Sequence, residues 1–256
     1  MSNNQRYAIY YAPAQESRLD RFGAGLLGYD AFGGGDLPFP AEVLQAAPDW
    51  QELTADPRKY GFHATLKAPF HLAPDKTEAE LLAACSAFAA TPRAIPVIKP
   101  VVGSISGFIA VIPETPPPEL IQLAAVCVTA FDSFRAPLTD ADRARRNPSQ
   151  LTPAQREHLD RWGYPYVMDD FRFHMTLTGR LGSARHDPVL AMLKARFVAL
   201  GLATLAIDRV VVFRQANATS RFRIVGEWDL RGDTANVDLG GMIAGQQVES
   251  RKHRKP

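Results

Sequence analysis

The sequence predicts an α+β fold in which one αβ unit occurs twice and forms two similar lobes. Two observations predict it. The order strand, helix, strand, helix, strand occurs twice, and the central strand of each copy carries the pattern Phe-His-x-Thr-Leu. Each central strand must bury its apolar face under helices, so the two polar faces are left to line a cleft. We expect one bilobal domain over residues 1–232, with its lobes at about 6–102 and 107–230.

The first unit begins with an alternating, aromatic segment that ends at Pro13, as is typical of a strand. In its second helix, Thr77 and Glu80 have the spacing of a capping box. Prolines in its last segment indicate an edge strand. The expected elements of this unit are residues 6–13, 14–27, 60–70, 76–90 and 94–102.

The second unit repeats this order and adds one more strand. Its expected elements are residues 107–113, 118–134, 171–181, 187–200, 204–214 and 220–230. The glycine- and proline-rich segment 32–40 is expected to be a flexible linker or a lid over the cleft. Segment 136–167 is polar and helical in parts. Residues 233–256 lack periodicity and end in a basic cluster, which predicts a disordered basic tail.

Composition and charge place the chain among ordinary globular proteins, with 46% hydrophobic and 22% charged residues. The net charge of +2 gives no reason to expect nonspecific binding to nucleic acid or to a membrane. No apolar run approaches the roughly 20 residues that span a bilayer. The first residues lack the pattern of a signal peptide, and the two cysteines, Cys85 and Cys127, lie in apolar stretches. We therefore expect a cytoplasmic location.

The two central strands carry the same polar groups at the same spacing, because side chains alternate between the faces of a strand. The polar face of the first strand carries His63, Thr65 and Lys67. The polar face of the second carries Arg172, His174, Thr176 and Thr178. The chain has six histidines, which by chance would give under about one His-x-Ser/Thr. Two copies with the same flanking Phe and Leu therefore indicate a shared function.

Two facing His-Thr pairs suit acid–base chemistry on a phosphodiester. One imidazole can take a proton from water while the other gives a proton to the leaving oxygen. The hydroxyls of Thr65 and Thr176 can donate hydrogen bonds to the phosphoryl oxygens. Attacking and leaving oxygens lie roughly in line, so acid and base belong on opposite sides of phosphorus. Lys67 and Arg172 can neutralise the phosphate charge, although Lys67 can also be an edge residue that extends to solvent.

The sequence offers no metal-binding or nucleotide-binding motif. It contains no HExxH, His-x-His or Cys-x-x-Cys, so we expect neither a metal nor a cofactor. Segment 32–40 matches neither a phosphate-binding P-loop nor G-x-G-x-x-G. His71, His158 and His186 lie near expected loops or helix ends and are expected to be surface or capping residues.

The paired His-x-Thr motifs resemble the two-histidine (2H) phosphoesterase superfamily. The phrases YGFHATLKAPF, WGYPYV and FRFHMTLTGRL are similar to one branch, labelled putative phosphonate metabolism protein. The resemblance covers roughly residues 5–230. It implies two facing antiparallel sheets with a central cleft, as in 2H phosphoesterases and RNA-ligase-like proteins, and metal-independent chemistry on phosphodiesters. His63, Thr65, His174 and Thr176 occupy the catalytic motif positions.

The resemblance also bears on the substrate, because this branch occurs alongside genes of phosphonate breakdown. That route produces a ribosyl 1,2-cyclic phosphate, which is the expected small-molecule substrate. Lys67, Arg172 and Tyr60 are the expected substrate-binding residues. Two alternatives stay open: the same chemistry on RNA 2′,3′-cyclic ends, which the near-neutral charge disfavours, and a module that binds phosphate without turnover.

Overall fold

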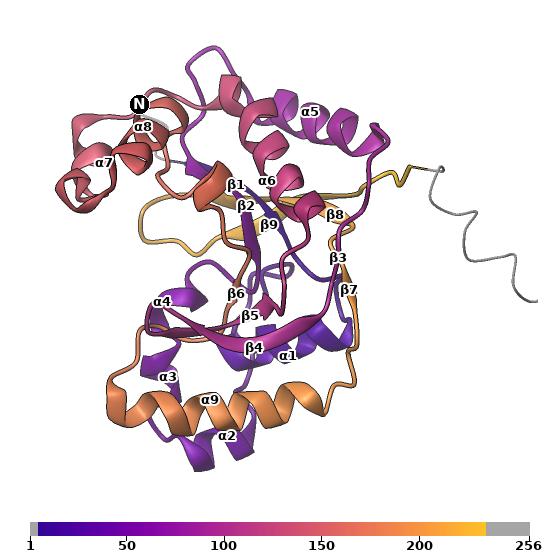
Figure 1. Cartoon of the computed structure of the whole chain (residues 1–256), viewed down its shortest axis with the longest axis vertical. Coiled ribbons are helices and arrows are strands. Elements are labelled where there is room, and N and C mark those ends of the chain that lie inside the picture. The colour runs from indigo at the N-terminus through magenta and orange to yellow at the C-terminus, as the bar shows by residue number, and fades with distance from the viewer. Residues whose placement is uncertain (1–4, 234–256) are drawn as a thin grey trace, which may run out of the picture.

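The computed structural model describes residues 5–233 and shows an α+β fold built on an antiparallel sheet (Figure 1). Within these residues the sheet has seven strands in the order β4-β5-β6-β2-β1-β8-β9. These strands are β1 (Arg6–Tyr11), β2 (Ala64–Phe70), β4 (Pro100–Ile105), β5 (Phe108–Pro113), β6 (Met175–Thr176), β8 (Arg209–Gln215) and β9 (Arg223–Asp229). A separate antiparallel pair joins β3 (Val97–Ile98) to β7 (Leu205–Ala206). The predicted tail lies outside the described residues, apart from Asp233.

The sheet consists of two halves that meet between the two histidine motifs. Strands β4, β5 and β6 form one half, and β2, β1, β8 and β9 form the other. The halves are joined at β2 and β6 through a single register pair, Ala64 with Met175. The two antiparallel sheets expected from the sequence are therefore two halves of one hydrogen-bonded sheet, with both motifs at the junction.

Nine α-helices surround the sheet in the described part of the chain. They are α1 (Arg18–Leu27), α2 (Ala41–Ala46), α3 (Trp50–Leu53), α4 (Ala55–Arg58), α5 (Glu78–Ala90), α6 (Pro118–Ala130), α7 (Asp140–Ala144), α8 (Pro153–Trp162) and α9 (Ser183–Val198). Short 3₁₀ turns follow α6, α7 and α8 at η1 (Asp132–Phe134), η2 (Pro148–Gln150) and η3 (Met168–Asp170). The capping box predicted at α5 is confirmed, because Thr77 Oγ1 accepts from the Glu80 N–H while Glu80 accepts from the Thr77 N–H.

The two halves of the sheet do not follow the two sequence repeats. Strands β8 and β9 come from the second repeat but pair beside β1. Strand β4 comes from the first repeat but pairs with β5, because Ser106 and Gly107 both have positive φ and form a tight hairpin turn. Helix α6 packs on β2, α5 on β8 and β9, and α9 on β4. The expected lobe boundaries are corrected accordingly: each half combines segments of both repeats.

The glycine-rich segment 32–40 is held at the start of β9 by contacts with two arginines. Arg221 forms an ion pair with Asp36, and the Arg223 guanidinium donates to the Gly33 carbonyl at 3.0 Å. Gly34 has φ +79°, and a side chain there would meet Arg223. None of these residues lines the cavities described below.

Candidate active site

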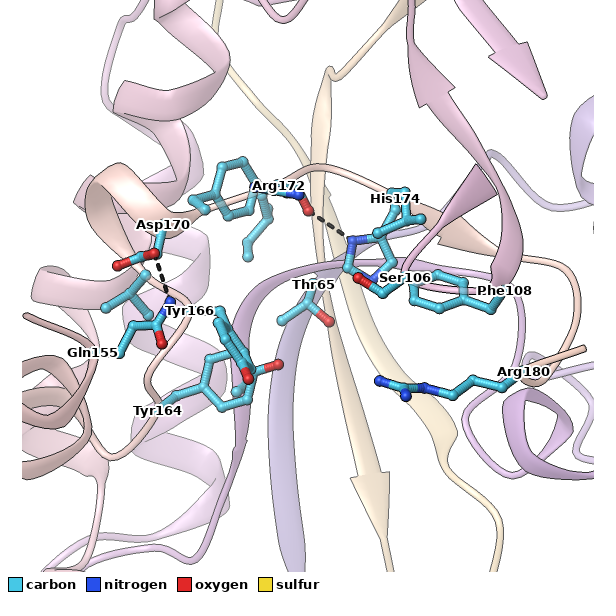
Figure 2. A pocket seen from close by; sticks show the side chains of 15 residues that line it. Thr65, Ser106, Phe108, Gln155, Tyr164, Tyr166, Asp170, Arg172, His174 and Arg180 are labelled. Carbon is cyan, nitrogen blue, oxygen red and sulfur yellow. Dashed lines mark hydrogen bonds between the residues drawn. The ribbon is translucent and has the colours of Figure 1, made fainter. Parts of the chain in front are cut away.

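Both histidine motifs face connected cavities at the junction of the sheet halves. A cavity of about 620 Å³, here the histidine cavity, is lined by His63, His174 and Thr176. A second, of about 390 Å³, here the tyrosine cavity, is lined by Thr65, Tyr164 and Tyr166 (Figure 2). The two cavities share the residues Phe108, His174 and Arg180. The structure thus brings the four motif residues to one composite site.

His63 lies immediately before β2 and is fixed by its own backbone and by an aromatic neighbour. Its Nδ1 donates to the Gly61 carbonyl at 2.9 Å. Gly61 has φ +76°, a left-handed conformation that favours glycine. The ring stacks on Tyr10, with centroids 3.8 Å apart and planes 19° apart. Its Nε2 lies 3.4 Å from Thr65 Oγ1.

His174 is oriented in the same way in the other half. Its Nδ1 donates to the Arg172 carbonyl at 2.7 Å, as the dashed line in Figure 2 shows. In both motifs the imidazole therefore bonds to the carbonyl two residues earlier, which places the neutral ring's proton on Nδ1. Nε2 is left as the atom that can accept a proton from, or donate one to, a molecule in the cavity.

The electrostatic surroundings keep both imidazoles neutral at pH 7. Burial lowers the pKa of His63 to about 4, and a positive charge on His174 lowers it further, against the opposing effect of the Gly61 carbonyl. Burial also lowers the pKa of His174, against the Arg172 carbonyl. An anion bound between the two rings would favour the protonated form of either one.

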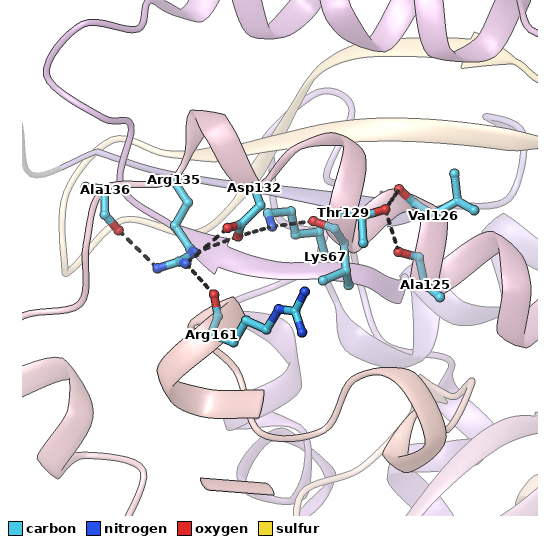
Figure 3. A network of polar contacts seen from close by, with 9 residues as sticks. Lys67, Ala125, Val126, Thr129, Asp132, Arg135, Ala136 and Arg161 are labelled. Atoms are coloured by element: carbon cyan, nitrogen blue, oxygen red, sulfur yellow. Dashed lines mark hydrogen bonds and ion pairs between the residues drawn. The ribbon is translucent and has the colours of Figure 1, made fainter. Parts of the chain in front are cut away.

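Lys67 does not line the cavity, which corrects the expectation that it contacts the substrate. In β2 the register shifts between the pairs Tyr10–Thr65 and Ile9–Lys67, so a bulge falls at Leu66. The bulge turns Lys67 to the side of α6, where it is 3% exposed. Lys67 Nζ donates to the Val128 carbonyl at 2.9 Å and to Asp132 Oδ1 at 3.1 Å (Figure 3).

The other two expected binding residues lie at the cavities. Arg172 is exposed and lines the tyrosine cavity. Tyr60 lines the histidine cavity, with its ring centroid 6.2 Å from that of His63. Its ring stacks on Phe222 at 5.2 Å. Their placement is compatible with substrate contact, which stays a prediction.

Sequence reasoning missed Arg180 and the aromatic walls. Arg180 is exposed, lines both cavities and extends into the space shown in Figure 2. No carboxylate within the described residues forms an ion pair with it. Its position in the phrase TLTGR, six residues after His174, was the available signal. Tyr164 and Tyr166 come from the WGYPYV phrase and contact each other edge to face at 5.6 Å.

In residues 5–233 no group of three or more His, Cys, Asp and Glu side chains is placed to hold a metal ion. Among the helices described, none combines the length and the apolar character that crossing a membrane needs.

The chain belongs to the family described as protein of unknown function DUF1045, whose model matches residues 65–223. It is 37% identical over 252 residues to ribose 1,5-bisphosphate phosphokinase PhnN of Janthinobacterium sp. (strain Marseille), covering 93% of this chain and 54% of that protein. A protein of the same name from Laribacter hongkongensis (strain HLHK9) is 31% identical over 220 residues, covering 86% of this chain and 50% of that one. The chain spans about half the length of these relatives.

Two solved structures match most of the chain at low sequence identity and low TM-score. E. coli LigT complexed with 3′-AMP matches at 13% identity and a TM-score of 0.35, covering 89% of this chain and 99% of that one. A conserved protein of unknown function, ATU0111 from Agrobacterium tumefaciens, matches at 12% identity and a TM-score of 0.42, covering 87% and 85%.

Proposed function

We propose that this protein is a metal-independent phosphodiesterase of the 2H type that hydrolyses a small cyclic phosphodiester. The observation that carries the proposal is the mirrored orientation of His63 and His174. Each imidazole donates Nδ1–H to the carbonyl two residues before it. Both rings line one cavity, so two Nε2 atoms are available for a single substrate.

In the proposed reaction, Nε2 of one neutral histidine takes a proton from water as its oxygen attacks phosphorus. The other histidine, protonated on Nε2, gives its proton to the leaving oxygen as the P–O bond breaks. The ring opens to a phosphate monoester and a free hydroxyl group. Thr65 and Thr176 donate to the phosphoryl oxygens, and Arg180 supplies positive charge beside them.

The surroundings of His63 suit a base. Burial lowers the pKa of His63 to about 4, so this imidazole is held in the neutral form that accepts a proton. We assign His63 as the base and His174 as the acid. The substrate bis(p-nitrophenyl) phosphate tests the assignment, because its leaving group needs no proton. Loss of the acid should then matter far less than loss of the base.

The proposed substrate is a ribosyl 1,2-cyclic phosphate. The resemblance to the phosphonate-linked branch suggests it, and the two relatives are named for a phosphorylated ribose, ribose 1,5-bisphosphate. Their names also describe a phosphokinase. The 256 residues of this chain contain no G-x-x-x-x-G-K-S/T motif, so we propose hydrolysis rather than phosphoryl transfer from a nucleotide.

A second candidate is a nucleoside 2′,3′-cyclic phosphate or an RNA end that carries one. The tyrosine cavity favours it, because Phe108, Tyr164 and Tyr166 offer aromatic surfaces on which a base can stack.

A turnover assay compares 5-phosphoribosyl 1,2-cyclic phosphate, its analogue without the 5-phosphate, nucleoside 2′,3′-cyclic phosphates and an RNA oligomer with a cyclic end. We expect the ribosyl compound to have the highest kcat/KM and activity to survive EDTA. Higher kcat/KM for the nucleotides or the RNA would reject the ribosyl compound as the preferred substrate, while the two-histidine mechanism would still hold. No turnover of any compound would favour a phosphate-binding module.

A further inference from the structure

A third cavity, of about 300 Å³, lies beside the histidine cavity and is rich in arginine. Its charged and titratable lining consists of Arg6, His71, Arg135, Asp142, Arg145 and Arg146. We call it the arginine cavity. Tyr60 lines both this cavity and the histidine cavity, so the two adjoin at that side chain.

Two of the four arginines are already neutralised. Arg135 Nε bonds to Asp132 Oδ1 at 2.9 Å, and Arg145 forms an ion pair with Asp142. Within residues 5–233, neither Arg6 nor Arg146 forms an ion pair with a carboxylate. Their charges are the ones available to a ligand.

Neutral contacts hold these two guanidinium groups in place. Arg6 Nε donates to Gln215 Oε1 at 2.7 Å, and the group lies 5.5 Å from the centre of the Phe222 ring. The Arg146 guanidinium lies 4.9 Å from the centre of the Tyr164 ring. Amide and aromatic contacts orient a guanidinium without cancelling its charge, as an anion site requires.

Both guanidinium groups also act on the hydroxyl of Tyr10, whose ring stacks on His63. The Tyr10 ring stacks on His63 at 3.8 Å. Burial raises the pKa of Tyr10 well above its usual value, and the charges of Arg6 and Arg146 act against that rise, so both lie within electrostatic reach of its hydroxyl. His71 also lines this cavity, and its Nδ1 donates to the Gln5 carbonyl at 2.8 Å.

We propose that the arginine cavity binds a second phosphate of the substrate, with Arg6 and Arg146 as its ligands. The inference rests on the proposed function, since the histidines act on the phosphodiester in the adjoining cavity. Planar guanidinium groups match phosphate geometry, and two unneutralised ones favour a dianion over a singly charged group. The site selects substrates that carry a terminal phosphate in addition to the scissile diester.

The two cations that precede Tyr60 in the chain, Arg58 and Lys59, have contacts of their own. Arg58 donates to the Leu27 carbonyl at 2.7 Å and to Thr54 Oγ1 at 2.7 Å. Lys59 pairs with Asp56 at 2.9 Å. Neither lines the arginine cavity, whereas Arg6 and Arg146 do.

The test measures kcat/KM of Arg146→Gln on 5-phosphoribosyl 1,2-cyclic phosphate and on the analogue lacking the 5-phosphate. We expect at least about a tenfold loss on the first, since a charge-assisted hydrogen bond contributes about 1.5–3 kcal/mol, and less than a twofold change on the second. Arg6→Gln should act alike, and Arg146→Lys should recover part of the loss. Arg143→Gln is the control, because Arg143 pairs with Asp160 and does not line the cavity.

Equal losses on both compounds, or no loss on either, would overturn the proposal. Calorimetry with ribose 5-phosphate and with ribose gives a readout that does not need turnover. If no cyclic phosphate reacts, the proposed function fails, and calorimetry still decides on the site. Tighter binding of ribose 5-phosphate than of ribose, weakened at least tenfold by Arg146→Gln, would support it, and equal affinities would overturn it.

Discussion

The two copies of Phe-His-x-Thr-Leu share their histidine, threonine and flanking residues and differ after the leucine. The fourth residue after the histidine is Lys67 in the first copy and Thr178 in the second, and both are buried. Lys67 bonds to Asp132 and the end of α6, whereas Thr178 Oγ1 accepts the Ile109 N–H at 3.0 Å. The repeated pattern therefore places one His-Thr pair in each half of the sheet, whereas the next polar side chain makes contacts within the fold.

The surroundings of the two imidazoles differ as well. His63 precedes the seven-residue strand β2. Its ring stacks on Tyr10, and its centroid lies 5.8 Å from that of Phe213. His174 precedes a strand of two residues and lies 5.5 Å from Phe108, beside the exposed Arg180. We propose that the two copies of the pattern serve two roles, because their different neighbours set how easily each imidazole is protonated.

The largest expected effect tests the part that the copies share. His63→Ala and His174→Ala should each lower kcat about 10²–10⁴-fold, the contribution of a general acid or base. The measurement is steady-state kinetics on the preferred cyclic phosphate, with His186→Ala as a control away from both cavities. Near-full turnover in either variant would end the two-histidine assignment.

The same variants can separate the two roles. On bis(p-nitrophenyl) phosphate, the kcat of His174→Ala should be at least about tenfold higher than that of His63→Ala. The reason is that a good leaving group departs without a proton from the acid. Recovery in His63→Ala instead would reverse the assignment and leave the mechanism. Equal losses of kcat in both variants would show that neither imidazole protonates the leaving oxygen.

The threonines are expected to contribute less. Thr65→Val and Thr176→Val should each lower kcat/KM by about 10–150-fold, the equivalent of 1.5–3 kcal/mol for a hydrogen bond to a charged group. Thr→Ser keeps the hydroxyl and should stay within about fivefold of the wild type. A Val variant as active as the Ser variant would show that its hydroxyl does not bind the phosphate.

The sequence predicted the long, periodic elements of the fold and missed the short ones. Period-2 and period-3.6 patterns indicated most strands and long helices, and the motifs identified His63 and His174. Helices α2 to α4 were missed, because elements of four to six residues show too little periodicity. The bulge at Leu66 was also hidden, since strand alternation assumes an unbroken register.

The lowered histidine pKa values predict an acidic optimum. Above pH 6.5, kcat/KM should fall close to tenfold per pH unit, because the acid must be protonated in the free enzyme and its pKa lies below the usual 6.5. The analogue without a 5-phosphate should be used, since its diester keeps one charge over this range. A flat profile from pH 6.5 to 8.5 would show that no histidine acts as the acid.

Stability should respond to pH through His63. Its folded-state pKa of about 4 lies below the unfolded value, so the unfolded chain binds more protons between pH 4 and 6.5. The contribution is fully present above pH 6.5 and is lost as pH falls toward 4. Denaturant titrations should show this fall in the wild type, and a smaller fall in His63→Phe. An equal fall in both would assign the pH dependence to other groups.

The smallest effect on activity is expected where the copies diverge, at Lys67. Lys67→Met should leave kcat/KM within about threefold, because the side chain faces α6 and lines neither cavity. Stability should fall by about 1–3 kcal/mol, since the buried Val128 carbonyl loses its donor while Asp132 keeps Arg135. Lys99→Met is the matched control, because Lys99 is exposed and pairs with Glu114. Its effect on the free energy of unfolding should stay within about 0.5 kcal/mol. Urea unfolding and kinetics on the same samples separate the two effects. A more than tenfold loss of kcat/KM at unchanged stability would show that Lys67 contacts the substrate. The substrate-binding face of the first copy would then extend beyond Thr65.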